Sequence, residues 1–158
     1  PMVCERYELR DDVMPGAGKY RGGIGVVKSQ RILTDGIITH ESERHTNVPW
    51  GIFGGKEGAP GKCEIYNVLS NGPAQEMHSK FHGLEVKQDD VMAYYSPCGG
   101  GFGSPLERDP QKVLDDVLDG FCSATQAHDV YGVVLDLDAE VVVADATKAR
   151  REKLDAEA

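Results

Sequence analysis

The 158-residue sequence lacks several features that mark nucleic-acid-binding and membrane proteins. Basic residues are scarce, because 17 Lys and Arg stand against 26 Asp and Glu, for a formal net charge of −9. This balance argues against binding to phosphate backbones or to anionic membrane surfaces. No apolar run approaches the roughly 20 residues of a membrane-spanning helix. We recognise no secretory leader pattern and therefore expect a cytoplasmic protein.

Metal-binding patterns are also missing. The four cysteines, at positions 4, 63, 98 and 122, form no Cys-x-x-Cys pair, which argues against a zinc knuckle. His40 and His45 are five residues apart on an expected strand and should point to opposite faces. His78 and His82 have helical spacing, but no Glu lies between them. We therefore expect reduced thiols and no metal ligand in this chain.

Glycine, in contrast, is abundant, with 19 residues and the densest run within residues 96–110. Gly99, Gly100, Gly101 and Gly103 are not expected in a helix, where each would cost ~1 kcal/mol relative to alanine. Glycine instead permits a positive φ or a close approach between backbones. The run matches neither the phosphate-binding loop nor the dinucleotide-binding pattern. A tight structural corner is the favoured interpretation.

Cys98 and a cluster of aspartates could each have either a catalytic or a purely structural role. Cys98 directly precedes the glycine run, where backbone N–H groups could lower its pKa and stabilise an oxyanion. No motif pairs a histidine with it, so a small apolar filler is favoured. The carboxylates of Asp115, Asp116 and Asp119 are most simply a solvated helix face, because a catalytic dyad would need burial.

Hydrophobic patterning predicts an α+β fold: a predominantly antiparallel β region with glycine-rich loops over residues 1–104, then a short helical region over residues 105–158. Asp35-Gly36 predicts a hairpin between two β-prone runs. Strand-like runs cover residues 3–10, 19–33, 37–46, 63–69, 80–86 and 90–95.

Helix signals gather after the glycine run. Asp109 and Pro110 are a typical cap and first helical residue, and apolar residues from Val113 to Phe121 mark one helix face. Gly120 should end this helix in a left-handed conformation. Ser123 should cap a second short helix, followed by a hairpin over residues 133–143 and a helical tail.

A series of motifs runs in one order through almost the whole chain. They are residues 5–10 (ERYELR), 16–25 (GAGKYRGGIG), 49–55 (PWGIFGG), 58–61 (GAPG), 79–81 (SKF), the glycine loop 99–103, 105–110 (PLERDP) and 131–134 (YGVV). In this combination the chain resembles the C-terminal part of the hydantoinase B/oxoprolinase family. Cys98 stands where the family usually has another glycine. Ser104 stands where aspartate is usual, which argues against a strict catalytic role at that position.

The resemblance implies a component of an enzyme. Such B-type subunits work with an A-type subunit of the actin-like ATPase superfamily, which uses ATP and Mg to phosphorylate the substrate. The following step is amide-ring hydrolysis in hydantoinases, oxoprolinases and lactamases. In acetone and acetophenone carboxylases it is carbon–carbon bond formation with activated bicarbonate. The divalent-metal ligands of the family lie upstream of this part, so no metal ligand and no catalytic residue is assigned to the chain.

Three functions remain: a part of an ATP-dependent cyclic-amide hydrolase, which is favoured, a part of a ketone carboxylase, or a non-catalytic assembly subunit. In the first, the chain supplies walls of the active site and is inactive alone. The expected partners are the remainder of the B-type subunit, an ATPase-like subunit of the A type, and a small-molecule substrate, with no nucleic acid or membrane. The candidate residues for a substrate channel or loop are Arg21, Gly22, Gly23, Trp50, Cys98, Gly99, Gly100 and Gly101.

Overall fold

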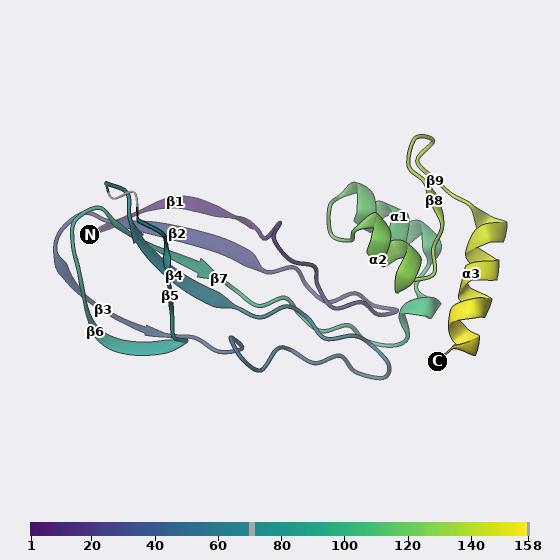
Figure 1. The fold of residues 1–158 in the computed structure, drawn as a ribbon, viewed down its shortest axis with the longest axis horizontal. Coiled ribbons are helices and arrows are strands. Elements are labelled where there is room, and N and C mark those ends of the chain that lie inside the picture. The colour runs from purple at the N-terminus through teal and green to yellow at the C-terminus, as the bar shows by residue number, and fades with distance from the viewer. Residues whose placement is uncertain (70–71, 158) are drawn as a thin grey trace. The chain divides into compact units, whose positions relative to one another are not determined.

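The structure is a computed structural model that describes residues 1–69 and 72–157. It confirms an α+β fold of antiparallel sheets and short helices (Figure 1). The chain forms two compact units whose segments interleave in the sequence. Unit 1 comprises Pro1–Arg10, Gly25–Val48 and Pro60–Pro97, and unit 2 comprises Asp11–Ile24, Pro49–Ala59 and Cys98–Ala158. A domain boundary after residue 104 stays a prediction.

Unit 1 is built on a five-stranded antiparallel sheet with the strand order β1-β2-β7-β4-β5. Its strands are β1 (Met2–Leu9), β2 (Val26–Ile32), β4 (Lys62–Asn67), β5 (Gln75–Met77) and β7 (Asp90–Tyr95). Strand β7 lies in the middle and is the most buried, since Val91, Met92 and Ala93 are at most 3% exposed. A second sheet pairs β3 (Gly36–Glu41) with β6 (Lys80–Val86).

The expected hairpin across Asp35-Gly36 is wrong. Strand β2 pairs with β7 and β3 pairs with β6, so the chain passes from one sheet to the other at this turn. The Asp35 carboxylate accepts hydrogen bonds from the Gln88 backbone N–H (2.9 Å) and from Lys87 Nζ (3.0 Å). These bonds tie the β2–β3 turn to the β6–β7 turn. Local turn chemistry located the bend but could not identify the strand partners, which are distant in sequence.

Unit 2 contains the helices α1 (Pro110–Leu118), α2 (Ala124–Asp129) and α3 (Ala144–Ala156), a 3-10 turn at Pro105–Glu107, and a hairpin of β8 (Leu135–Asp136) and β9 (Val141–Val142). The predicted caps are confirmed. The Asp109 carboxylate accepts a hydrogen bond from the Gln111 N–H (3.0 Å), and Ser123 Oγ accepts one from the Gln126 N–H (3.0 Å). Gly120 has a φ of 80°.

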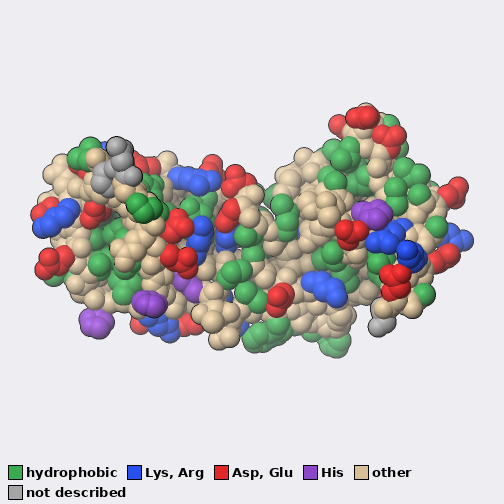
Figure 2. All heavy atoms as spheres, viewed as in Figure 1, with side chains coloured by type: hydrophobic (Ala, Val, Ile, Leu, Met, Phe, Trp, Pro, Cys, Tyr) green, Lys and Arg blue, Asp and Glu red, His purple; other side chains and the backbone are tan. Residues whose placement is uncertain are grey.

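The helical part of unit 2 has a core of its own. Its buried members are Ala17, Val113, Cys122, Ala127, Tyr131 and Val133. The outer surface is charged, and Figure 2 shows acidic side chains spread over the visible face among basic and hydrophobic ones. The described residues include no helix long and apolar enough to cross a membrane.

Candidate functional site

The sequence-predicted channel residues all belong to three glycine-rich segments of unit 2, which we call the glycine segments: residues 11–24, 49–59 and 98–103. Their backbones are hydrogen-bonded to one another, with Gly99 N–H donating to Gly23 O, Gly101 N–H to Lys56 O, and Ile52 N–H to Gly101 O, each at 2.9 Å. The structure therefore brings together segments that are far apart in the sequence.

The backbones can pack this closely because glycine has no Cβ atom. A Cβ atom added to Gly100 would lie 2.0 Å from the carbonyl oxygen of Trp50, and one added to Gly22 would lie 2.0 Å from that of Gly99. A Cβ on Gly101 would meet the carbonyl oxygen of Ala17 at 2.0 Å. Of the run, only Gly103 has a left-handed φ, of 75°. The central glycines thus serve close approach between backbones rather than an unusual torsion.

Gly23 and Trp50 differ from the packed glycines. Nothing lies within 4 Å of a Cβ built on Gly23, so this position has open space beside it. The Trp50 side chain is 66% exposed. Within the glycine segments, Gly23 therefore has free volume beside it and Trp50 presents an exposed aromatic ring.

Arg21 points to the helical part of unit 2. Its Nε donates a hydrogen bond to Asp116 Oδ1 (3.1 Å), and its guanidinium lies 4.8 Å from the centre of the Phe121 ring. Arg108 donates to the other oxygen of the same carboxylate, from Nε at 3.1 Å and from a terminal nitrogen at 2.8 Å.

The expectation of a solvated carboxylate face is therefore wrong for Asp116, which is 6% exposed, although Asp115 and Asp119 are exposed. Hydropathy patterning assigns every aspartate to the polar face of a helix. It cannot show that two arginines satisfy a buried one, least of all Arg21, which lies 95 residues away in the sequence.

The three buried cysteines show little reactive character. Cys98 is fully buried, and its backbone N–H donates to the carbonyl oxygen of Ala59 at 3.0 Å. A buried side chain among packed backbones favours the small apolar filler over a nucleophile that must reach a substrate. Burial raises the pKa of Cys63 to about 11 and that of Cys122 to about 12, so both stay thiols at neutral pH.

Exposed aromatic side chains gather on the glycine segments. The Phe102 ring centre lies 6.2 Å from that of Tyr20 and 5.2 Å from that of Phe53. The exposed fractions are 62% for Tyr20, 79% for Phe53 and 46% for Phe102. Isolated bridges connect the Phe102 backbone to Tyr20 and to Ile52, which is also exposed. We call Tyr20, Phe53 and Phe102 the aromatic cluster, with the exposed Ile52 beside it. Exposed apolar groups of this kind mark contact surfaces.

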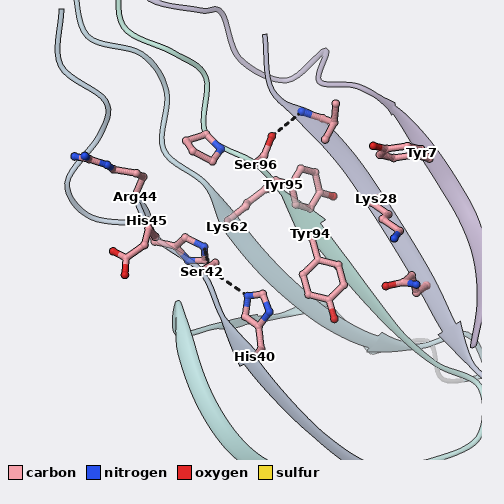
Figure 3. A pocket seen from close by; sticks show the side chains of 14 residues that line it. Tyr7, Lys28, His40, Ser42, Arg44, His45, Lys62, Tyr94, Tyr95 and Ser96 are labelled. Atoms are coloured by element: carbon pink, nitrogen blue, oxygen red, sulfur yellow. Dashed lines mark hydrogen bonds between the residues drawn. The ribbon is translucent and has the colours of Figure 1, made fainter. Parts of the chain in front are cut away.

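A second feature lies in unit 1 and was missed at the sequence level. His40 and His45 line one cavity instead of pointing to opposite faces (Figure 3). Ser42 Oγ lies 3.1 Å from His40 Nε2 and 2.8 Å from His45 Nε2. Strand β3 ends at Glu41, and Arg44 has a φ of 66°, so the chain turns and returns His45 to the side of His40. The predicted strand through residue 46 is therefore wrong, and no local signal corrects it.

In the described residues, no group of three or more His, Cys, Asp or Glu side chains is placed to hold a metal ion.

Comparison with known proteins places the chain. The sequence model of the hydantoinase B/oxoprolinase family matches residues 1–105. The chain belongs to this family. A protein of Pseudomonas sp. (strain NS671), provisionally named as the B component of a D-/L-hydantoinase, is 39% identical over 96% of this chain and 25% of its own length. The beta chain of the caprolactamase of Pseudomonas jessenii is 29% identical over 96% of the chain and 26% of its own length.

Solved structures share the fold. The ATP-dependent caprolactamase of Pseudomonas jessenii superposes with a TM-score of 0.72 and 25% identity, covering 96% of this chain and 26% of that one. A nucleotide-free acetone carboxylase superposes with a TM-score of 0.74 over 99% of this chain and 25% of that one, at 24% identity. The chain therefore spans about a quarter of the length of these relatives, some of which are named as ATP-dependent enzymes and as subunits.

Proposed function

We propose that this family member is a component of an ATP-dependent multisubunit enzyme that hydrolyses a cyclic amide of the hydantoin, oxoproline or lactam type. The chain supplies walls of the active site rather than the reactive groups. The family and its named relatives support the reaction class, and the observation that carries the role as a wall is the glycine packing with its exposed aromatic cluster. Such a rigid backbone assembly, with apolar side chains turned to solvent, suits a surface against which other polypeptides complete a site.

The proposed partners are the remainder of a B-type subunit and an A-type, ATPase-like subunit. In this proposal ATP and Mg are held by the A-type partner, a divalent metal belongs to the rest of the B-type polypeptide, and the complex works in the cytoplasm. The eight candidate residues then have divided roles. The packed glycines and Cys98 buttress the wall, Gly23 lies beside open space, Trp50 presents an exposed ring, and Arg21 fastens the wall to Asp116.

Reconstitution tests the reaction. The complete complex containing this chain is assayed for ATP-dependent opening of a hydantoin or lactam, and in parallel for ATP-dependent consumption of a ketone with bicarbonate. We expect ring opening, and we expect the chain alone to be inactive. Turnover only with ketone and bicarbonate would establish the second candidate, which the acetone carboxylase alpha subunit of Xanthobacter autotrophicus supports at 27% identity over 76% of this chain. Full activity of the complex without this chain would show that the chain is a non-catalytic assembly subunit.

Gly23 provides the test of the wall. A Gly23→Val substitution adds a side chain to open space, so the fold and assembly should persist while kcat/KM falls about tenfold or more through crowding of the substrate path. Gly36→Val is the matched control, because its Cβ would meet only the Thr34 carbonyl oxygen at 4.0 Å. Equal activity of both variants would remove Gly23 from the wall.

Trp50 reports assembly. It is the only tryptophan of the chain and is 66% exposed, so burial against a partner should shift its fluorescence to shorter wavelength. An unchanged emission in the assembled complex would show that this surface stays in water.

A further inference from the structure

Unit 1 contains a cavity of about 530 Å³ that the glycine segments do not share. It is lined by side chains from the five-stranded sheet, from β3 and from the turn that follows β3, among them Tyr7, Lys28, His40, His45, Lys62 and Tyr94 (Figure 3). Its size falls in the range of small-molecule sites, which combine apolar walls with a few polar groups.

Aromatic rings form the walls. The Tyr94 ring centre lies 4.9 Å from that of His40, and both residues line the cavity. Burial raises the pKa of Tyr94, so its hydroxyl stays neutral, and it donates to Met92 Sδ at 3.4 Å. Tyr7 and Tyr95 add two further rings. These surfaces suit a flat apolar body, because aromatic rings favour offset or edge contacts with one another.

The charge of the lining is positive, against a net charge of −9 for the chain. Lys28 Nζ lies 5.9 Å from the centre of the Tyr7 ring, and no ion pair of Lys28 occurs within residues 1–69 and 72–157. Lys62 Nζ is shared between Glu64 Oε1 (2.9 Å) and the Tyr95 ring (4.2 Å).

The remaining charged lining residues do not oppose an anion. Arg44 points away from the His40 ring in Figure 3. Among the described lining residues the one carboxylate is Glu43, which Lys80 Nζ neutralises at 2.6 Å.

The polar corner of the cavity is held in place from several sides. Ser42 Oγ contacts both imidazoles and lies 3.1 Å from the Ser79 carbonyl oxygen. Its single proton can serve only one of these three neighbours, so a histidine must donate its own N–H to the Ser42 oxygen whenever the hydroxyl serves Ser79. Gly61 N–H donates to the Arg44 carbonyl oxygen at 3.0 Å, which fixes the turn in its left-handed conformation.

Gly61 also leaves room for His45, since a Cβ there would lie 3.2 Å from His45 Cδ2 and 3.0 Å from the Tyr95 carbonyl oxygen. A non-glycine residue such as Arg44 in the left-handed region costs about 1–3 kcal/mol and is typical of functional sites. The turn at Arg44 therefore places His45 at the cavity.

We propose that this cavity binds a small organic carboxylate, with its flat apolar body against the Tyr94 ring and its carboxylate at Lys28, which pairs with Tyr94 across neighbouring strands. The inference concerns unit 1 and holds whether or not the proposed enzymatic function is correct. Burial lowers the pKa of His40, so the positive charge at this place comes from Lys28, which has no carboxylate of its own among the described residues. Charge-assisted bonds of this kind are about twice as strong as neutral ones.

Benzoate is the probe, and the full chain is titrated with it at low ionic strength and pH 7 while amide and imidazole NMR signals are followed. We expect saturable shifts confined to the cavity. Benzamide, which has the same body without the charge, should bind at least about tenfold more weakly. Inorganic phosphate, an anion without an apolar body, should also be at least about tenfold weaker.

Variants locate the site. Lys28→Gln should weaken benzoate binding about tenfold, and Lys28→Arg should retain most of it. Lys87→Gln is the matched control, because Lys87 is an exposed lysine of the same unit that pairs with Asp35 outside the cavity. Non-saturable shifts, equal affinity for benzamide or phosphate, or an unchanged affinity in a folded Lys28→Gln variant would each overturn the proposal.

Discussion

The five-stranded sheet of unit 1 and the glycine segments of unit 2 both join backbones that are distant in sequence, but they use side chains in opposite ways. In the sheet, side chains alternate between two faces and the strands stand about 4.8 Å apart. In the glycine segments, carbonyl oxygens occupy the space where Cβ atoms would be, as at Gly22, Gly100 and Gly101. The sheet can therefore absorb changes of side-chain shape, whereas the glycine segments cannot accept a side chain at these positions.

The largest effect is expected for Gly100→Ala. Its methyl group would overlap the Trp50 carbonyl oxygen at 2.0 Å, and a backbone oxygen held by its own chain cannot rotate away. We expect a loss in the free energy of unfolding of more than about 5 kcal/mol, measured by urea denaturation or seen as failure to fold. Gly23→Ala, with open space around it, should change stability by less than about 1 kcal/mol. Similar losses in both variants would contradict backbone-to-backbone packing.

The second-largest effect is expected within unit 2, at the buried carboxylate of Asp116. Asp116→Ala leaves Arg21 and Arg108 without their shared carboxylate, and breaking such a buried pair costs about 3–5 kcal/mol. Urea denaturation measures this loss. Asp115→Ala is the control on the exposed face of the same helix and should stay within about 0.5 kcal/mol. A harmless Asp116→Ala would show that helix packing holds unit 2 without the arginines.

Alkaline pH should also weaken the fold. Burial, aided by the charge of Asp116, raises the pKa of Cys122 to about 12, whereas an unfolded thiol loses its proton near pH ~8.5. Between these values the unfolded state binds fewer protons, so stability falls as pH rises, by at most about 1.4 kcal/mol per pH unit for one thiol.

Urea midpoints at pH 8, 9.5 and 10.5 measure this slope, and Cys122→Ala should reduce it, leaving the share of Cys63, whose pKa burial raises to about 11. Tyr131, whose pKa burial raises to about 12, supports the same trend at higher pH. Identical slopes for the two proteins would show that the Cys122 thiol is not held neutral by the fold.

The smallest effect belongs to the sheet. Met92 is fully buried in β7, and Met92→Leu keeps nearly the same volume and loses only the weak sulfur acceptor of the Tyr94 hydroxyl. The free energy of unfolding should therefore fall by less than about 1.5 kcal/mol in urea denaturation. Met92→Ala, which leaves a cavity, should cost about 2–5 kcal/mol. A Met92→Leu loss as large as that of Gly100→Ala would erase the distinction between the two regions.

Local signals in the sequence predicted what local physics decides. Asp109, Gly120 and Ser123 were correctly assigned to helix ends, because a cap depends on the next few residues only. For the glycine run, the sequence left a positive φ and a close approach between backbones as alternatives, and the structure shows close approach at Gly100 and Gly101. The residues whose backbones pack against the run, such as Ala17 and Trp50, were not predictable. A glycine indicates that another atom can lie close by, but it does not identify that atom.

Pairings between distant residues were the part that sequence could not supply. The pairing of β3 with β6 depends on which strands share a sheet, and Asp116 depends on Arg21 far away in the chain. His40 and His45 line the same cavity because Arg44, between them in the sequence, adopts a left-handed conformation. An arginine in the sequence does not predict that conformation. The cavity in unit 1 was missed for this reason.

The glycine packing has a consequence at the level of the gene. Any nucleotide change in a glycine codon that alters the encoded residue introduces at least a Cβ atom, so no conservative replacement exists for Gly22, Gly100 or Gly101. No residue smaller than glycine exists, so substitutions at these positions are not tolerated. Sequence variation should occur instead in the exposed aromatic cluster on these segments. Diversification of this surface among related proteins should then proceed ring by ring over an unvarying backbone.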